Sequence, residues 1–274
     1  QNKYMNPLSY NLIIILSFFI SLCITLFIIP KLIHKMQISE ITGIDVNKSD
    51  KPMIPEMGGL AAVLGFSLST SITLGIVKYF GTINETPVLV SISVICIAAL
   101  IGLLDDVSIL GRKEKAWFIS LSSFPLIISQ VGDEELNLLF AEYDFSGYNL
   151  IFWLFLVPLG ISGCANAFNM SAGYNGLESG QMMIMSSTLL IICFLDKAQD
   201  SIMIILSSIF GSTLALFYYN KYPAKLFVGD VGTLGFGALI AAVTIMSGNI
   251  VYGVVCIIPT FYELSSTLKY SYKG

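Results

Sequence analysis

Long apolar runs alternate with short polar segments along the whole chain. Nine runs are long enough to cross a bilayer as helices, which takes about 20 residues each. We expect them at residues 8–33, 58–77, 88–104, 116–131, 150–168, 181–195, 201–219, 231–247 and 252–268. The runs are continuously apolar rather than alternating, which excludes a transmembrane β-barrel. The pattern predicts an all-α, polytopic membrane protein with about nine transmembrane helices.

Composition supports the same class. The chain of 274 residues is 55% hydrophobic and 12% charged, with a mean hydropathy of +0.80, so it has too little polar surface to cover a soluble globule. Its five cysteines lie in or beside apolar runs without paired short spacing, which argues against a disulfide framework or a zinc site. His34 is the only histidine, so histidine-based triads are excluded.

The basic residues are distributed asymmetrically between the loops. Eleven of the fourteen Lys and Arg residues lie in residues 31–57, 105–115, 218–230 and 266–274. These segments share one side if nine helices alternate, and the basic side of a membrane protein is the cytosolic one. The acidic segment 131–147 then becomes an exterior connection, for which we expect no catalytic role.

Four polar clusters fall on the predicted cytosolic side. They read "GIDVNKSDKPMIPEMGG", "GLLDDVSILGRKEK", "NAFNMSAGYNGLESGQ" and "NKYPAKLFVGDVGT". Loops positioned by rigid spans are where binding and catalytic residues concentrate. We therefore expect the four segments to build one site, although the first alone would pass for an ordinary loop.

Two adjacent acids, Asp105 and Asp106, end the third apolar run. Carboxylates are unfavourable at the C-terminus of a helix, so their placement indicates a partner, either a metal ion or one of the basic residues at 112, 113 and 115. Neighbouring helical positions point about 100° apart, so the two acids cannot face one atom within a helix. Interfacial helix-end charges remain the alternative interpretation.

Asp230 and the asparagines are candidates for metal and base binding. Asp230 lies between glycines before an apolar helix, where it is either an N-cap or a Mg²⁺ ligand close to phosphate. Asn169 can offer Mg²⁺ a neutral oxygen, and Asn175 can match a nucleobase edge with its donors and acceptor. Asn166 shares a face with Asn169 if the fifth helix continues through both. The alternative is a glycine-rich turn.

Together these clusters indicate phosphoryl chemistry on a charged substrate at the membrane surface. "LLDDV", "NAFNMSAGYNGLESGQ" and "AKLFVGD", in this order, resemble the polyprenyl-phosphate N-acetylhexosamine-1-phosphate transferases. Bacterial members typically carry aspartates where this chain has Ala172 and Asn175. That variant, with "DVNK" and "IPEMGG" upstream, resembles the eukaryotic and archaeal branch that acts on dolichyl phosphate.

The resemblance implies transfer of N-acetylglucosamine-1-phosphate from UDP-N-acetylglucosamine to dolichyl or another polyprenyl phosphate, with release of UMP. This is the first step of lipid-linked oligosaccharide synthesis for N-glycosylation. It implies Mg²⁺, with Mn²⁺ as an alternative, and a cytosolic site in the endoplasmic reticulum membrane of a eukaryote or the cell membrane of an archaeon. Membrane lipid is an expected partner, a homodimer is compatible with the family, and nucleic acid is not expected.

The resemblance also assigns residues. It makes Asp105, Asp106 and Lys115 catalytic, Asn169 and Asp230 metal ligands, and Lys115 and Asn166 binders of the lipid phosphate. The residues that border the nucleotide-sugar would be Ile44, Asp45, Val46, Glu56, Gly173 and Asn175. We expect direct in-line attack by the lipid phosphate on the β-phosphate, because a phosphate monoester is mostly dianionic at neutral pH and needs no general base. A covalent aspartyl intermediate is the competing route.

The resemblance predicts a single transferase domain over residues 1–274. Family members have a tenth span preceded by a loop with histidine and arginine residues, and neither is present in this sequence. We therefore expect a chain that lacks its last segment and is inactive or weak as written. Two other functions compete: a bacterial-type undecaprenyl-phosphate enzyme, and a membrane transporter, which would place its site near the bilayer midplane.

Overall fold

The computed structural model describes residues 7–108, 110–132, 135–138 and 141–271. Its helices are α1 (Pro7–Ile38), α2 (Gly58–Phe80), α3 (Thr86–Ser108), α4 (Arg112–Ser120), α5 (Phe124–Ser129), α6 (Asn149–Ile151), α7 (Val157–Ser171), α8 (Leu177–Leu195), α9 (Asp200–Asn220), α10 (Asp230–Met246) and α11 (Ile250–Ser271). Short helical turns are η1 (Leu121–Ser123), η2 (Ser146–Tyr148) and the π-helical η3 (Phe152–Leu156). Each of the nine predicted spans coincides with one helix or one run of consecutive helical segments.

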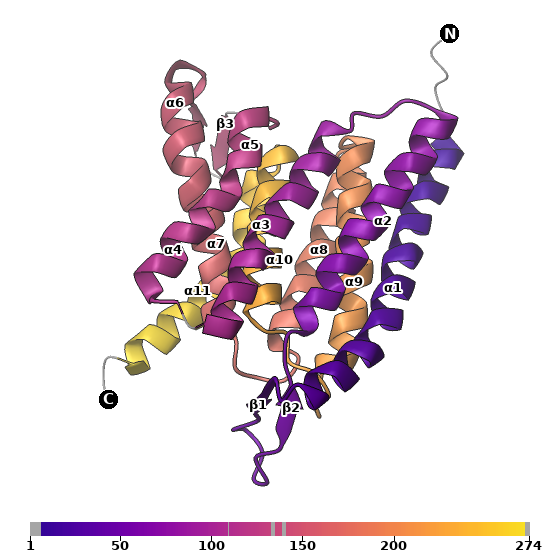
Figure 1. Cartoon of the computed structure of the whole chain (residues 1–274). Helices are drawn as coiled ribbons and strands as arrows, with labels where there is room; N and C mark the ends of the chain where they lie inside the picture. Colours follow the sequence, from indigo (N-terminus) through magenta and orange to yellow (C-terminus); the bar gives the residue numbers. More distant parts are fainter. Residues whose placement is uncertain (1–6, 109, 133–134, 139–140, 272–274) are drawn as a thin grey trace.

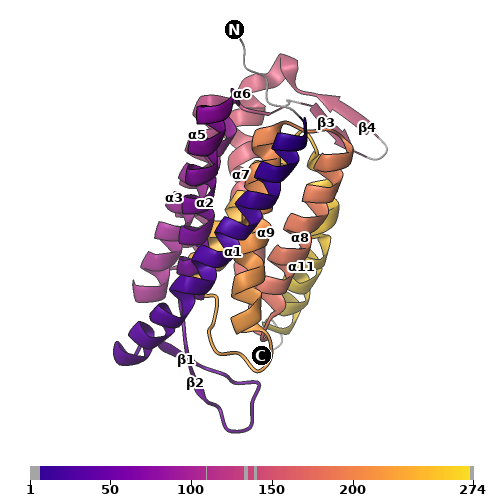
Figure 2. The same ribbon diagram turned by 90° about the vertical axis from the view of Figure 1, so that its right-hand side faces the viewer.

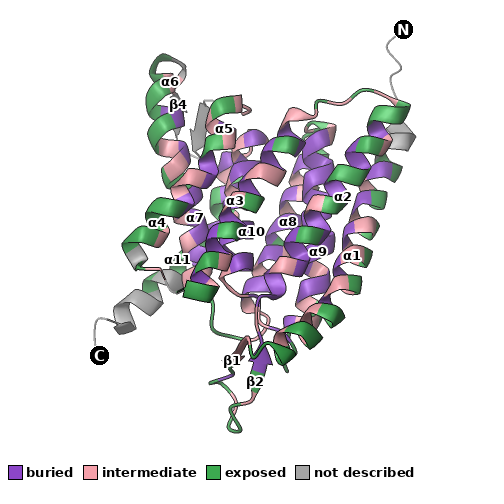
Figure 3. Ribbon diagram, in the orientation of Figure 1, coloured by how far each residue is buried: buried purple, intermediate pink, exposed green. Residues whose placement is uncertain are grey.

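Within the described residues, six helices are long and apolar enough to cross a membrane: α1, α2, α3, α8, α9 and the run from α6 to α7. The helix α10 and residues 250–262 of α11 are shorter apolar segments. Large apolar side chains such as Leu12, Phe27, Leu100, Phe155 and Ile191 are exposed on the outside of the bundle. Figure 3 shows the buried residues gathered where helices face one another and the exposed ones on the outer faces, as a bilayer-embedded bundle requires.

The fourth and fifth predicted spans are not uniform α-helices. In the fourth, the hydroxyls of Ser120, Ser122 and Ser123 each donate to the carbonyl three residues earlier, and the chain tightens into η1 between α4 and α5. In the fifth, Pro158 lacks the N–H that an α-helix needs, and the π-helical turn η3 directly precedes α7.

The prediction of an all-α chain missed two antiparallel hairpins. Strands β1 (Thr42–Ile44) and β2 (Met53–Pro55) pair with Gly43 opposite Ile54, and β3 (Glu135–Leu138) pairs with β4 (Ala141–Asp144). Strands of three or four residues are too short to show an alternating pattern. The predicted acidic segment 131–147 contains β3 and β4 and lies partly outside the described residues.

Helix α10 lies inside the bundle, packed against α2, α3 and α7, while α1 and α2 pack on α9 (Figures 1 and 2). Hydroxyl side chains join α1, α2 and α9: Ser21 donates to the carbonyl of Ser208 at 2.7 Å, and Ser69 donates to that of Ser17 at 2.7 Å. Small hydroxyl residues let helices approach closely and satisfy their own polar groups where water is absent.

The two hairpins lie at opposite ends of the bundle in both views (Figures 1 and 2). At the end that carries β1 and β2, here called the hairpin end, α3, α7 and α9 finish, and α2, α4, α8 and α10 begin. The predicted basic segments 31–57, 105–115 and 218–230 meet there. The described part of 266–274 belongs to α11, which ends toward the same side (Figure 1). The four polar clusters therefore share one surface, as predicted.

Candidate functional site

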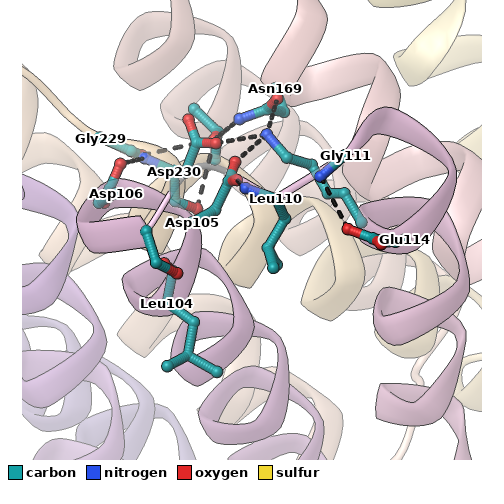
Figure 4. Close-up of polar contacts among 12 residues, drawn as sticks. Leu104, Asp105, Asp106, Leu110, Gly111, Glu114, Asn169, Gly229 and Asp230 are labelled. Atoms are coloured by element: carbon teal, nitrogen blue, oxygen red, sulfur yellow. Dashed lines mark hydrogen bonds and ion pairs between the residues drawn. The ribbon is translucent and has the colours of Figure 1, made fainter.

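Three oxygen atoms from three helices converge on the ammonium group of Lys115. They belong to Asp105, Asn169 and Asp230, which Figure 4 shows close together. The lysine Nζ lies 2.6 Å from Asp230 Oδ2 and 3.3 Å from Asn169 Oδ1, and it forms an ion pair with Asp105 Oδ2. Helix α4 supplies the lysine, α3 and α10 the two acids, and α7 the asparagine. The unfavourable carboxylate predicted at the end of α3 thus has a basic partner, and that partner is Lys115.

Lys115 stays charged in this setting. Its side chain is only 16% exposed. Burial lowers its pKa, but the adjacent carboxylates of Asp105 and Asp230 outweigh that effect and hold the pKa above the ordinary lysine value. The other oxygen of Asp105 accepts the N–H of Leu110, so the same side chain fixes the turn between α3 and α4 (Figure 4). The site therefore keeps a permanent positive charge beside two acids.

Asp106 points elsewhere, as the 100° rule predicts for adjacent helical residues. Its Oδ1 accepts the N–H of Asp230 at 2.9 Å, and its Oδ2 accepts the N–H of Val231 at 3.1 Å. These are two of the unpaired donors at the start of α10. Gly229 occupies the N-cap position with a φ of 72°, so Asp230 is the first residue of the helix. The alternative prediction of Asp230 as an N-cap is wrong.

Asn166 and Asn169 share a face, because α7 continues to Ser171. The two amides have different partners: Asn169 Nδ2 donates to Thr233 Oγ1 at 3.0 Å, whereas Asn166 Nδ2 donates to the carbonyl of Ser162 at 2.8 Å. Thr233 therefore turns the oxygen of Asn169 toward Lys115. Ser162 in turn donates to the carbonyl of Ala116 in α4, which ties Asn166 to the helix that carries Lys115.

A cavity of about 280 Å³ opens beside this cluster at the hairpin end. Its lining includes Asp106, Asp230 and Thr233, and Asp230 contacts Lys115. All six residues predicted to border the nucleotide-sugar line the same cavity: Ile44, Asp45, Val46, Glu56, Gly173 and Asn175. Asp105 and Asn169 contact Lys115 beside this cavity, and Asn166 lies on the same face of α7 as Asn169, bonded to Ser162.

Charged residues of the β1–β2 hairpin face the cavity. Asp45 is buried, and its pKa is lowered by hydrogen bonds from Asn175 and Lys48. Glu56 is half-buried, and its pKa is raised by loss of solvent and by the negative charge of Asp230. A Cβ at position 43 would meet the carboxylate of Glu56, so Gly43 leaves room for that carboxylate in its present position.

Six further polar or aromatic residues line the cavity and were not among the predicted site residues: Asn47, Tyr174, Glu178, Asn220, Phe227 and Thr233. Glu178 Oε1 accepts the N–H of Gly173 at 3.1 Å, while its Oε2 is buried with no hydrogen-bond partner among the described residues. The predicted span began at 181, whereas α8 begins at Leu177, so Glu178 was assigned to a loop. The signal that could have identified it is an acidic residue only three positions before the predicted apolar span.

Asn220 organises the loops around the cavity. Its Oδ1 accepts the N–H of Gly176 at 3.1 Å and the hydroxyl of Ser179 at 2.7 Å, and its Nδ2 donates to the carbonyl of Leu226 at 3.0 Å. One buried amide at the end of α9 therefore joins the α7–α8 turn to the segment that leads into α10.

Asp105, Asn169 and Asp230 direct oxygens to one positively charged atom, Lys115 Nζ, and these oxygens could hold a cation. The described residues contain no group of three His, Cys, Asp or Glu side chains arranged around a metal position. An amide oxygen completes the set here, which is compatible with a hard cation that prefers oxygen ligands.

Comparison with known proteins defines the family. A model of glycosyl transferase family 4 matches residues 88–248. A protein of Saccharolobus solfataricus, provisionally named UDP-N-acetylglucosamine--dolichyl-phosphate N-acetylglucosaminephosphotransferase, is 34% identical over 98% of this chain and 81% of its own length. A provisionally named glycosyltransferase of Methanocaldococcus jannaschii is 34% identical over 90% of this chain and 72% of its own length.

A bacterial relative is more distant. The phospho-N-acetylmuramoyl-pentapeptide-transferase of Streptococcus mutans is 29% identical over 82% of this chain and 70% of its own length. Archaeal and bacterial relatives that are named as transferases thus match most of the chain, and these matches do not support the transporter alternative. The chain belongs to glycosyl transferase family 4 and is a polytopic membrane protein of that family.

Proposed function

We propose that this chain transfers N-acetylglucosamine-1-phosphate from UDP-N-acetylglucosamine to dolichyl phosphate or a related polyprenyl phosphate. The observation that carries the proposal is the single cavity lined by all six predicted nucleotide-sugar residues and bordered by Asp106 and Asp230. The name of the Saccharolobus solfataricus relative supplies the substrates. The bacterial-type reaction on undecaprenyl phosphate is the second candidate, favoured only by relatives of lower identity.

The transfer we propose is a direct displacement. An oxygen of the lipid phosphate attacks the β-phosphorus of the UDP-sugar, and the bond between that phosphorus and the bridging oxygen breaks. UMP leaves with the bridging oxygen, and the lipid phosphate gains the sugar phosphate, so that the lipid now carries a diphosphate linked to the sugar. The attacking phosphate is already mostly dianionic at neutral pH, so no side chain has to remove a proton. In this route the acids position other groups and are not nucleophiles.

Lys115 is the residue best placed to counter phosphate charge. Its ammonium remains protonated and is directed by Asp105 and Asp230, whose carboxylates hold it at the border of the cavity. A positioned cation stabilises charge that develops on transferring oxygens more effectively where solvent is scarce. Asp105 thus acts through Lys115, and Asp106 acts by fixing the start of α10, where Asp230 lies.

The other half of the cavity suits a pyrimidine nucleotide. Tyr174 and Phe227 line it with aromatic rings, on which a base can stack. Asn175 offers an amide to the edge of the base, and Gly173 leaves room for close approach of the backbone. Asn166 is tied through Ser162 to α4, the helix that carries Lys115, and this supports its proposed role beside Lys115 in binding the lipid phosphate.

A divalent cation belongs to the proposed reaction. Asn169 and Asp230 would hold Mg²⁺, or Mn²⁺ in its place, and the donor chemistry fits because their oxygens already face one cationic atom. When bound, such an ion would neutralise charge on the diphosphate. The basic residues gathered at the hairpin end favour a cytosolic position for the site by the positive-inside rule.

Release of UMP tests the proposal. The purified complete gene product is incubated with Mg²⁺ and UDP-N-acetylglucosamine, with and without dolichyl phosphate, as wild type and as Asp230→Ala. We expect UMP only when the lipid is present, and at least a hundredfold less in the variant. UMP released without lipid would contradict direct displacement in favour of a covalent intermediate, and full activity of Asp230→Ala would contradict the assignment of Asp230.

A further inference from the structure

The side chain of Asn175 is held by a residue 130 positions away in the sequence. Its Nδ2 donates to Asp45 Oδ2 at 3.0 Å. The same oxygen lies 3.0 Å from Lys48 Nζ, and Asp45 Oδ1 accepts the N–H of Asn47 at 3.3 Å. Lys48 in turn lies over the ring of Tyr222, 5.6 Å from its centroid. Asp45 is thus a buried, ionised acceptor with a fixed position.

A second contact fixes the hairpin against the turn that carries Asn175. Asn47 Nδ2 donates to the carbonyl of Gly173 at 2.6 Å. The β1–β2 hairpin and the α7–α8 turn are therefore joined at two points on one wall of the cavity, and both points lie among its lining residues. These contacts hold the carboxylate of Asp45 in place, so it does not move with the amide of Asn175 if that amide rotates.

The charge of Asp45 decides which way the amide of Asn175 faces. An ionised carboxylate only accepts hydrogen bonds, so it requires the nitrogen of the amide on its side. The reversed orientation would place the amide oxygen about 3 Å from a carboxylate oxygen, with one hydrogen bond lost and two acceptors opposed. The order of acceptor and donor that Asn175 presents to the cavity is therefore fixed.

That order matters for a pyrimidine. The edge of uracil carries an N–H between two carbonyl groups, whereas the edge of cytosine carries a bare nitrogen beside an amino group. An amide that is free to turn over can match either base, and an amide that is locked matches one of them. We propose that Asp45 is a positioning residue that locks Asn175 and so makes the site selective for uracil over cytosine; this rests on the proposed function, which makes the substrate a uridine nucleotide.

Exchange of the two side-chain types tests this directly. Dissociation constants of UMP and CMP are measured by calorimetry for wild type, Asp45→Asn, Asn175→Asp and the double variant. Asp45→Asn keeps the shape but can donate or accept, so we expect the preference for UMP to fall about tenfold. Asn175→Asp opposes two carboxylates and should weaken UMP binding by at least tenfold. In the double variant, position 45 donates to an acceptor at 175, and the preference should return.

The control is Asp50→Asn, an exposed acid of the same hairpin, which should leave both constants unchanged. Thermal unfolding of each variant establishes whether it folds. If the double variant does not fold, the comparison of Asp45→Asn with wild type is sufficient to test the inference. An unchanged UMP preference in folded Asp45→Asn would overturn the inference while leaving the proposed function intact. A wild type that binds neither nucleotide would overturn the proposed function, and the inference with it.

Discussion

The carboxylate of Asp106 accepts the N–H of Asp230 at 2.9 Å, so one acid of the proposed site fixes the backbone of another. This contact joins the last turn of α3 to the first residue of α10, 124 positions apart. The Asp106 side chain also accepts the N–H of Val231. Adjacent acids in the sequence therefore have separate tasks: Asp105 pairs with Lys115, and Asp106 caps a helix.

Loss of that cap should affect stability as well as catalysis. Asp106→Ala leaves two N–H groups at the start of α10 without their acceptor, and removing a helix cap costs about 1 kcal/mol. We expect the Tm in detergent to fall by about 2–4 °C and the activity to fall at least tenfold. Asp50→Ala, which removes an exposed acid, should change neither. An unchanged Tm in Asp106→Ala would contradict the capping role.

Neutralising the central lysine should abolish most of the activity. Lys115→Met removes the only cation that contacts both Asp105 and Asp230 in the described residues and leaves the two acids facing each other. We expect kcat to fall at least a hundredfold, measured as UMP release. Lys113→Met, an exposed lysine two positions earlier in α4, serves as the matched control and should stay within about twofold of wild type. Equal losses in both variants would point to general surface charge instead.

Glu56 should give stability a defined pH dependence. Burial, together with the neighbouring charge of Asp230, raises its pKa above the ordinary value of 4.5. The folded state then binds more protons than the unfolded state, so this group's contribution to stability is present below pH 4.5 and is lost as pH rises through the raised pKa.

Glu56→Gln removes that titration. We expect the variant to have a higher Tm than wild type at pH 7.5, where Glu56 is charged, and nearly the same Tm at pH 4.5. Thermal unfolding of both proteins across this range measures the difference. A difference that grows toward acid pH would have the opposite sign and would contradict the raised pKa.

Glu178 should act on nucleotide binding through the α7–α8 turn. Its Oε1 accepts the N–H of Gly173, which lines the cavity together with Asn175. Glu178→Ala releases this turn, and we expect the KM for the UDP-sugar to rise about tenfold while the KM for the lipid stays within twofold. Glu178→Gln keeps an acceptor for Gly173 and should restore binding. A general loss of folding would instead lower the maximal rate and leave both KM values unchanged.

Hydropathy was sufficient to locate the helices, because a helix in a bilayer must be apolar over its whole length. It could not reveal η1 or η3, which depend on local serine and proline chemistry, or the three-residue strands of the β1–β2 hairpin. The start of α8 was misplaced by four residues, and Glu178 was missed for that reason.

The partners within the site depended on contacts between distant segments. The sequence indicated that the acid pair needed a partner, and offered Lys115 among several. It could not reveal that Asp105 pairs with Lys115, because that contact depends on where α3 ends. It also could not reveal that Asp106 accepts a hydrogen bond from the start of α10, or that Asp45 accepts one from Asn175, because these contacts join segments more than a hundred residues apart. The residue roles assigned by resemblance stay predictions.

The position of bond cleavage is the central claim, and an isotope experiment tests it most directly. UDP-N-acetylglucosamine labelled at the β-phosphorus is incubated with the protein, Mg²⁺ and dolichyl phosphate, and the lipid and aqueous phases are separated. Transfer of a sugar phosphate predicts that the label enters the lipid in equal amount with the sugar and that the released nucleotide is unlabelled UMP. Label recovered as UDP, with sugar alone on the lipid, would contradict it.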